Sequence, residues 1–167
     1  MDNKRIQLTL FIDTAEAAAI EKIRKEFNSL QYELIPAHVT LCREDELEGM
    51  EKVIQNLAAL HHPSITIHFG KPVRFAAGKG VMIPALENNE AFQQLRAVLL
   101  KGIITKPKRH EPHITLLHPR NAACTDALFE QIQNTAFPKS VTFKSISLVE
   151  QEGGQPWRVL QQFNLDK

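Results

Sequence analysis

The chain has 167 residues, an apolar share of 43% and a formal charge of +1 with its histidines neutral. This length predicts a single domain, or two small lobes that share an interface, and the apolar share is sufficient for a hydrophobic core. A charge near zero excludes strong nonspecific binding to nucleic acid or to an anionic membrane, so a role with nucleic acid would require a local site.

The cysteines and the N-terminus point to an intracellular environment. Cys42 and Cys124 have neither CxxC spacing nor metal-ligand neighbours, which predicts reduced thiols and no metal site. Residues 1–5 lack the apolar core of a signal peptide, and no run approaches 18 consecutive apolar residues. We therefore expect a cytoplasmic protein without a membrane segment.

The first half of the chain alternates between strand-like and helix-like periodicity. The predicted elements are strands over 5–12 and 38–41, helices over about 14–29 and 46–60, and a β-rich stretch over 64–76. Asp13 or Thr14 is the expected N-cap of the first helix. Gly70 and Pro72 interrupt the β-rich stretch and indicate a bulge or an edge position.

The second half repeats this order after a turn at 77–80. The predicted elements are strands over 81–85 and 113–116, helices over about 90–103 and 124–134, and two final strands near 139–149 and 156–165. The order is β-α-β-α-β followed by β-α-β-α-β-β, with an offset of 75 residues. Such self-similarity indicates an internal repeat.

The repeat is clearest in a nine-residue segment that occurs twice. Residues 36–44 read PAHVTLCRE and residues 111–119 read EPHITLLHP, so both contain His-aliphatic-Thr-Leu. Two chance copies would have a probability on the order of one in ten thousand. Because alternate side chains of a strand point to opposite faces, one set should be in the core and the other in open space. The core set is Val39, Leu41, Ile114 and Leu116, and the open set is His38, Thr40, His113 and Thr115.

This pattern predicts an α+β protein with a bilobal, duplicated fold. Two antiparallel-rich sheets should face a central cleft, with helices on the outside and a pseudo-twofold axis between the halves. The whole chain, 1–167, would form a single domain, with one repeat over about 4–77 and the other over about 78–167. The two His-Thr strands would then meet at one cleft.

Two imidazoles and two hydroxyls in one cleft suit phosphodiester transfer or hydrolysis. A histidine titrates near pH 6.5, so one ring can start neutral as a base and the other charged as an acid. Each threonine can donate its hydroxyl to a nonbridging phosphate oxygen. This scheme requires no metal ion.

The paired motifs, His38-Val39-Thr40 and His113-Ile114-Thr115, resemble those of the 2H phosphoesterase superfamily. The similarity is greatest to its bacterial and archaeal 2′-5′ RNA ligase and cyclic phosphodiesterase group. It implies metal-independent hydrolysis of 2′,3′-cyclic phosphates without a cofactor, with the two histidines and two threonines as the catalytic set. It also implies that the second motif histidine is the base and the first the acid. The substrate would be a nucleotide cyclic phosphate or an RNA end, and no obligate protein partner is implied.

Further residues are candidates for substrate binding. Arg43 and His118 each lie five positions after a motif histidine, which places them on the opposite face unless the strand ends first. There they would bind phosphate or carry a solvated charge. Phe11, on the same strand face as Gln7 and Thr9, and Trp157 would stack on a base or pack in the core.

A basic loop over 105–112, just before the second motif, contains Lys106, Lys108, Arg109 and His110. This loop would contact a nucleotide or an RNA backbone, or it would be an ordinary solvated loop.

Two alternative functions also fit the motifs. One is a 2′-5′ RNA ligase or phosphodiesterase on oligonucleotides, against which the neutral overall charge argues, and the other is a noncatalytic nucleotide- or RNA-binding module.

Overall fold

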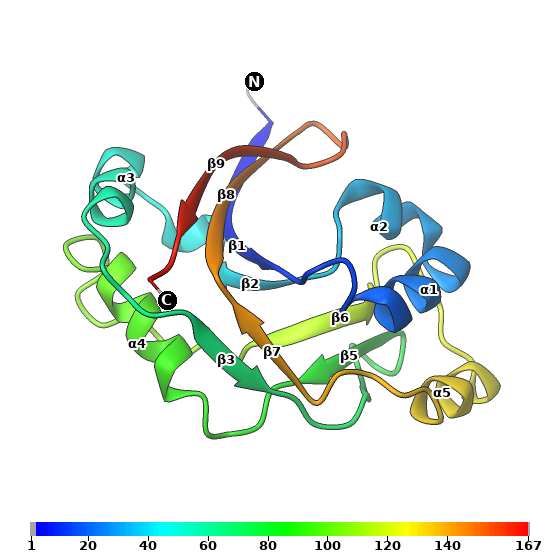
Figure 1. Ribbon diagram of the computed structural model, residues 1–167. Helices are drawn as coiled ribbons and strands as arrows, with labels where there is room; N and C mark the ends of the chain where they lie inside the picture. Colours follow the sequence, from blue (N-terminus) through cyan, green and yellow to red (C-terminus); the bar gives the residue numbers. More distant parts are fainter. Residues whose placement is uncertain (1–2, 167) are drawn as a thin grey trace.

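A computed structural model describes residues 3–166, which fold into two antiparallel sheets with helices around them (Figure 1). The seven-stranded sheet has the spatial order β4 (Val73–Phe75), β5 (Gly80–Pro84), β6 (His113–Leu117), β2 (His38–Cys42), β1 (Lys4–Phe11), β8 (Ser145–Glu152) and β9 (Arg158–Asn164). The two-stranded sheet pairs β3 (Ile65–His68) with β7 (Ser140–Phe143).

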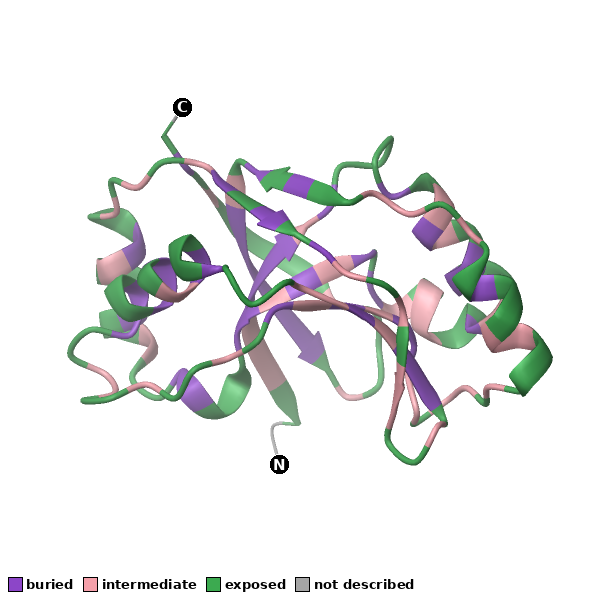
Figure 2. Cartoon of the chain, turned by 90° about the horizontal axis from the view of Figure 1, so that it is seen from below, coloured by how far each residue is buried: buried purple, intermediate pink, exposed green. Residues whose placement is uncertain are grey.

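The helices flank the strands on two sides, with α3 and α4 on one side and α1, α2 and α5 on the other (Figure 1). Their bounds are α1 Ala18–Phe27, α2 Ser29–Leu34, α3 Met50–Ala58, α4 Glu90–Leu99 and α5 Asp126–Gln133, with a short 3-10 helix η1 at Glu44–Glu46. Buried residues lie along the strands and on the inner sides of the helices (Figure 2). Within residues 3–166, none of the helices has the length and apolarity needed to cross a membrane.

The sheet order confirms the predicted duplication and its pseudo-twofold symmetry. The series β4-β5-β6 on one half corresponds to β8-β1-β2 on the other, and β2 and β6 meet at the bridge between Val39 and Ile114. The motif strands lie 75 residues apart, and so do β3 and β7. The two halves that we expected as facing sheets are joined here into one curved sheet (Figure 1).

The repeats also interlock through their helices. α1 of the first repeat packs against β6 of the second, and α4 of the second packs against β2 of the first. The predicted core residues of the motifs lie at this junction, and each of Val39, Leu41, Ile114 and Leu116 has at most 1% of its surface exposed. Burying one such side chain contributes about 1.5–3 kcal/mol. Both motif strands are therefore anchored to a common core.

The helix predicted over 14–29 is wrong in its bounds. α1 begins at residue 18 without a side-chain cap from Asp13 or Thr14, and the helix stops at Asn28, where φ is −146° and ψ is 53°. Asn28 is buried, donates to the side chain of Asn121 at 2.7 Å and accepts from the backbone N–H of His118 at 2.8 Å. These contacts with the second repeat hold Asn28 in a non-helical backbone conformation, although the sequence around it has helical periodicity. A separate helix, α2, begins at the next residue.

Three other predicted elements have different bounds for local reasons. Gly49, with φ +80°, separates η1 from α3 within the predicted helix 46–60. Gly102, with φ +81°, follows the end of α4, which stops at residue 99 instead of 103. The strand predicted over 139–149 divides at Lys144 into β7 and β8, which belong to different sheets. Alternation continues across that division, so periodicity alone does not reveal it.

Candidate active site

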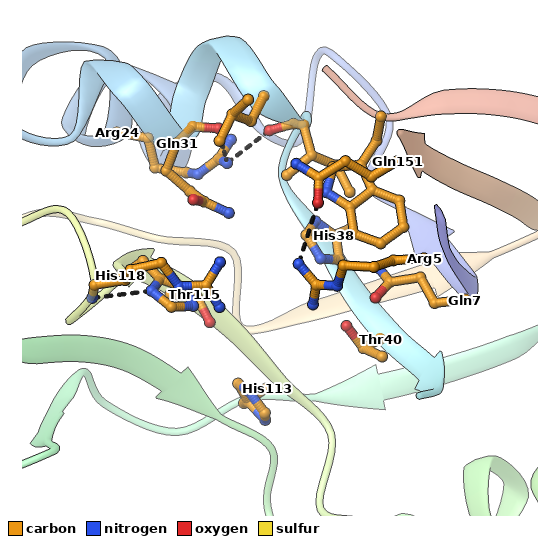
Figure 3. A pocket seen from close by; sticks show the side chains of 14 residues that line it. Arg5, Gln7, Arg24, Gln31, His38, Thr40, His113, Thr115, His118 and Gln151 are labelled. Atoms are coloured by element: carbon orange, nitrogen blue, oxygen red, sulfur yellow. Dashed lines mark hydrogen bonds between the residues drawn. The ribbon is translucent and has the colours of Figure 1, made fainter. Parts of the chain in front are cut away.

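The four motif residues line one cavity, which we call the central cleft (Figure 3). His38 and Thr40 project into it from β2, and His113 and Thr115 from β6. The other lining residues are Arg5, Gln7, Arg24, Gln31, Leu34, Ile35, His118, Arg120, Gln151 and Trp157. Among the described residues no aspartate or glutamate lines this cleft, which suits an anionic ligand.

Both motif imidazoles are oriented in the same way by the loop before their strand. Nδ1 of His38 lies 2.8 Å from the carbonyl oxygen of Pro36, and Nδ1 of His113 lies 3.1 Å from that of Glu111. A carbonyl oxygen can only accept, so Nδ1 carries the proton in each neutral ring. Nε2, on the other side of each ring, is thereby left as the acceptor available for chemistry.

The two threonine hydroxyls are available to a ligand. Thr40 and Thr115 are half-buried, and neither hydroxyl has a hydrogen-bond partner within residues 3–166. Each lies two residues after a motif histidine and therefore on the same strand face. The arrangement presents two acceptor nitrogens and two hydroxyl donors to one space.

Burial lowers the pKa of His38 from 6.5 to about 4, against the hydrogen bond to the Pro36 carbonyl, and the positive charge of Arg24 adds to the effect. The pKa of His118 is also lowered, first by burial and then by Arg120 and Arg5. Loss of solvation disfavours the charged form of an imidazole. Both rings are therefore neutral at pH 7 in the free protein.

Arg43 and His118 lie just beyond the ends of their strands, because β2 ends at Cys42 and β6 at Leu117. His118 lines the central cleft. Arg43 lines an adjoining cavity, which we call the side cavity and which contains Arg5, Gln7, Thr40, Arg43, Glu44, Asp45, His110 and His113. Four of these residues also line the central cleft, so the two spaces meet beside Thr40 and His113.

The two aromatic candidates have different positions. Trp157 lines the central cleft, and the Arg5 guanidinium lies 5.3 Å from the centre of its ring. Phe11 lines neither cavity and packs edge-on against His38, with 6.1 Å between ring centres. Trp157 is therefore placed to contact a ligand, whereas Phe11 supports a motif histidine.

The basic loop is only partly directed to the site. Lys106 and Arg109 line neither cavity, and Arg109 is held in ion pairs by Glu90, at 3.0 Å, and by Glu111. His110 does line the side cavity, with its ring centre 6.0 Å from that of His113. The loop therefore reaches the site through His110 and not through Lys106 or Arg109.

Five polar residues of the central cleft were not among the predicted site residues: Arg5, Arg24, Gln31, Arg120 and Gln151. Alternation along β1 could have found Arg5, which shares a strand face with Gln7. Arg120 follows the second motif directly. Its guanidinium has no ion pair or hydrogen bond within residues 3–166, whereas Arg5 pairs with Glu44.

The described residues contain no cluster of three or more His, Cys, Asp or Glu side chains suited to holding a metal ion. Cys42 and Cys124 are both free thiols, and Cys42 is buried.

A duplicated α+β fold with paired His-x-Thr strands at one cleft defines a two-histidine phosphoesterase. Comparison with known protein families matches residues 12–155 to the 2′-5′ RNA ligase superfamily. The chain belongs to this family of 2H phosphoesterases, which places it among phosphoesterases and RNA ligases.

Solved structures share the fold over nearly the whole chain. LigT of E. coli in complex with 3′-AMP has a TM-score of 0.68 at 18% identity and covers 98% of this chain and 99% of its own. The protein TT0787 of Thermus thermophilus has a TM-score of 0.61 at 17% identity and covers 96% of this chain and 97% of its own. At 17–18% sequence identity, this structural similarity shows that the fold is shared. No curated protein matches this sequence.

Proposed function

We propose that this protein hydrolyses 2′,3′-cyclic phosphodiesters of nucleotides or RNA ends without a metal ion, by acid–base catalysis between its two motif histidines. The observation that carries the proposal is the matched pair of imidazoles. Each has Nδ1 tied to a loop carbonyl and Nε2 left for one shared cleft. The nucleotide complexes of E. coli LigT, with 3′-AMP and with ATP, support a nucleotide as substrate.

The proposed reaction is an in-line displacement at phosphorus. The neutral histidine takes a proton from water as the water oxygen bonds to phosphorus. The bond from phosphorus to one ribose oxygen breaks, and the charged histidine protonates that oxygen. Thr40 and Thr115 donate hydrogen bonds to the nonbridging oxygens, where charge accumulates. The product is a ribonucleotide phosphomonoester with one free ribose hydroxyl.

The protonation state of His38 favours it as the base. Its pKa of about 4 keeps the ring neutral at pH 7, which is the form that accepts a proton. His113 is then the acid. This assignment is the reverse of the one that the family resemblance implies, so it needs its own test.

The pH dependence of kcat/KM provides that test, because kcat/KM reports the ionisations of the free enzyme. With His38 as base, we expect kcat/KM not to fall between pH 7 and about pH 5, and to fall as His38 is protonated near pH 4. If His38 were the acid, kcat/KM would already decline as pH rises above about 4. The pKa of His118 is lowered as well, so a His118→Gln variant should retain the same acidic limb.

The function itself is tested with a panel of cyclic and linear substrates. The panel contains 2′,3′-cyclic mononucleotides, 3′,5′-cyclic mononucleotides and 2′-5′ dinucleotides, each assayed with and without EDTA. We expect turnover of the 2′,3′-cyclic compounds to be unchanged by EDTA. Absence of turnover, or loss of activity with EDTA that added metal restores, would contradict the proposal.

The side cavity favours one second candidate, a 2′-5′ phosphodiesterase or ligase that acts on oligonucleotides. This cavity opens beside Thr40 and His113 and contains Arg43, so a longer chain could extend past the reacting phosphate. The same panel separates the candidates, since this alternative predicts faster cleavage of 2′-5′ dinucleotides than of cyclic mononucleotides.

Arg120 is expected to bind the substrate anion. It is exposed, lines the central cleft and has no partner for its guanidinium within residues 3–166. A hydrogen bond to a charged group contributes about 1.5–3 kcal/mol, so Arg120→Ala should raise KM about tenfold or more with a smaller change in kcat. The control is Lys144→Ala, which removes an equal charge from an exposed residue outside both cavities. Equal KM values for the two variants would argue against this contact.

A further inference from the structure

A second pair of equivalent residues lies in helices α1 and α4. Both helices have ten residues, and they begin 72 residues apart, whereas the motif strands lie 75 apart. Arg24 and Arg96 are the seventh residues of their helices, and each has only 2% of its surface exposed. The fourth residues are Glu21 and Gln93. Each helix thus carries a polar pair one turn apart at equivalent positions.

In the first repeat this pair contacts the peptide groups on both sides of Pro36. Arg24 Nη2 donates to the carbonyl oxygen of Ile35 at 2.7 Å, and Arg24 is ion-paired with Glu21. The Glu21 carboxylate accepts from the backbone N–H of Ala37 at 3.2 Å. Between these two contacts lies the Pro36 carbonyl that accepts from Nδ1 of His38. Arg24 and His38 both line the central cleft (Figure 3).

In the second repeat the equivalent pair contacts the loop before His113. Arg96 Nη2 donates to the carbonyl oxygen of Lys108 at 3.0 Å, and Gln93 Nε2 donates to that of His110 at 2.7 Å. The next carbonyl, that of Glu111, accepts from Nδ1 of His113.

Arg96 also extends into the first repeat. It donates to the carbonyl oxygen of Leu41, at the end of the first motif strand, at 2.7 Å, and forms a buried ion pair with Glu46. This contact joins the first motif strand to the loop that precedes the second motif.

Stability alone does not account for a buried arginine at both positions. A buried ion pair is often matched or exceeded in stability by apolar side chains of similar volume. α1 and α4 otherwise direct apolar residues inward at helical spacing, among them Ile20, Ile23, Phe92 and Leu95. The arginines are kept at two equivalent positions where each contacts the loop that orients a motif histidine.

We propose that Glu21–Arg24 and Gln93–Arg96 are positioning pairs, which hold the loop carbonyls that fix the Nδ1–H form and the direction of His38 and His113. The proposal rests on the proposed function in assigning a reaction to these histidines. A misplacement of about 1 Å in a catalytic group can reduce a rate about 100-fold, so these pairs would act on kcat through the histidines they orient.

The test is a double variant, Glu21→Gln with Arg24→Met, because removing the arginine alone would leave a carboxylate without its partner. We expect kcat to fall about 10- to 100-fold with KM within about threefold of the wild type. ¹⁵N NMR of the imidazoles should show that His38 changes from the Nδ1–H form to a mixture of tautomers. Lys25→Met, an exposed neighbour on α1, is the matched control and should change none of these quantities.

A folded double variant that keeps both the wild-type kcat and the His38 tautomer would overturn the proposal. If the double variant does not fold, Gln93→Met decides, because it removes a neutral, half-buried donor and leaves the buried charges in place. It should produce a mixture of tautomers at His113, whereas Gln94→Met, at the exposed neighbouring residue, should not. An unchanged His113 tautomer in Gln93→Met would then overturn it. The tautomers are measured without substrate, so absence of turnover by the wild type would count against the proposed function and leave this test intact.

Discussion

Replacing His38 or His113 with alanine is expected to reduce hydrolysis of 2′,3′-cyclic phosphates by about 1,000-fold in either variant. General acid or base catalysis by one positioned side chain contributes about 10²- to 10⁴-fold, and each variant lacks one of the two groups. The two rings lie on strands from different repeats but line the same cleft, so neither can replace the other. The measurement is kcat on a 2′,3′-cyclic mononucleotide with EDTA present.

His68→Ala provides the matched control, since this histidine is exposed on β3 and lines none of the cavities that hold motif residues. It should retain the wild-type rate. Circular dichroism and thermal unfolding would verify that the motif variants remain folded. A folded His38→Ala or His113→Ala variant with near wild-type kcat would refute the proposed chemistry.

The second large effect is expected from the motif threonines. Thr40→Val and Thr115→Val keep the shape of the side chain and remove the hydroxyl that faces the cleft. Loss of one donor to an oxygen that gains charge in the transition state typically costs about 10²- to 10³-fold, so we expect kcat/KM to fall about 100-fold in each variant.

A suitable control for these variants is Thr66→Val, because this exposed threonine lies on β3 and its hydroxyl is bonded to that of Thr142 at 2.7 Å. Its kcat/KM should equal that of the wild type. If both motif variants also kept wild-type kcat/KM, the threonines would have no direct contact with the reacting phosphate and the oxygens would need other donors.

The motif strands could be predicted closely because their signal is local. Period-two alternation places Val39 and Leu41 on one face and His38 and Thr40 on the other, and the structure buries the first two and leaves the second two at the cleft. The repeat allowed the same prediction for β6, because a duplicated segment directs the same positions into the core and the same positions to the cleft.

Features that depend on contacts between the repeats could not be predicted in this way. The helix break at Asn28 exists because this side chain contacts residues of the second repeat, about 90 positions away. The equivalence of Arg24 and Arg96 could not be predicted for a related reason. The segment between α1 and β2, which contains α2, covers residues 28–37, and its counterpart between α4 and β6 covers 100–112. An alignment at the motif offset therefore does not place the two arginines together.

Peripheral binding residues were harder to infer than catalytic ones, because composition does not show how surface charges pair. Arg109 was a candidate on charge alone, yet the structure holds it against Glu90 and Glu111. Arg120, the unpaired cation of the cleft within residues 3–166, follows the second motif but lies outside its repeated core. The sequence does not show which of these two arginines is paired.

The proposed mechanism requires that the two copies of the motif build one site. A double-mutant cycle on His38→Ala and His113→Ala tests this directly through kcat/KM on a 2′,3′-cyclic mononucleotide. Groups that act as a unit lose nearly all their contribution when either is removed. We therefore expect the double variant to be within about threefold of the slower single variant. If instead the two losses multiplied, the histidines would act independently and the single-site account would be wrong.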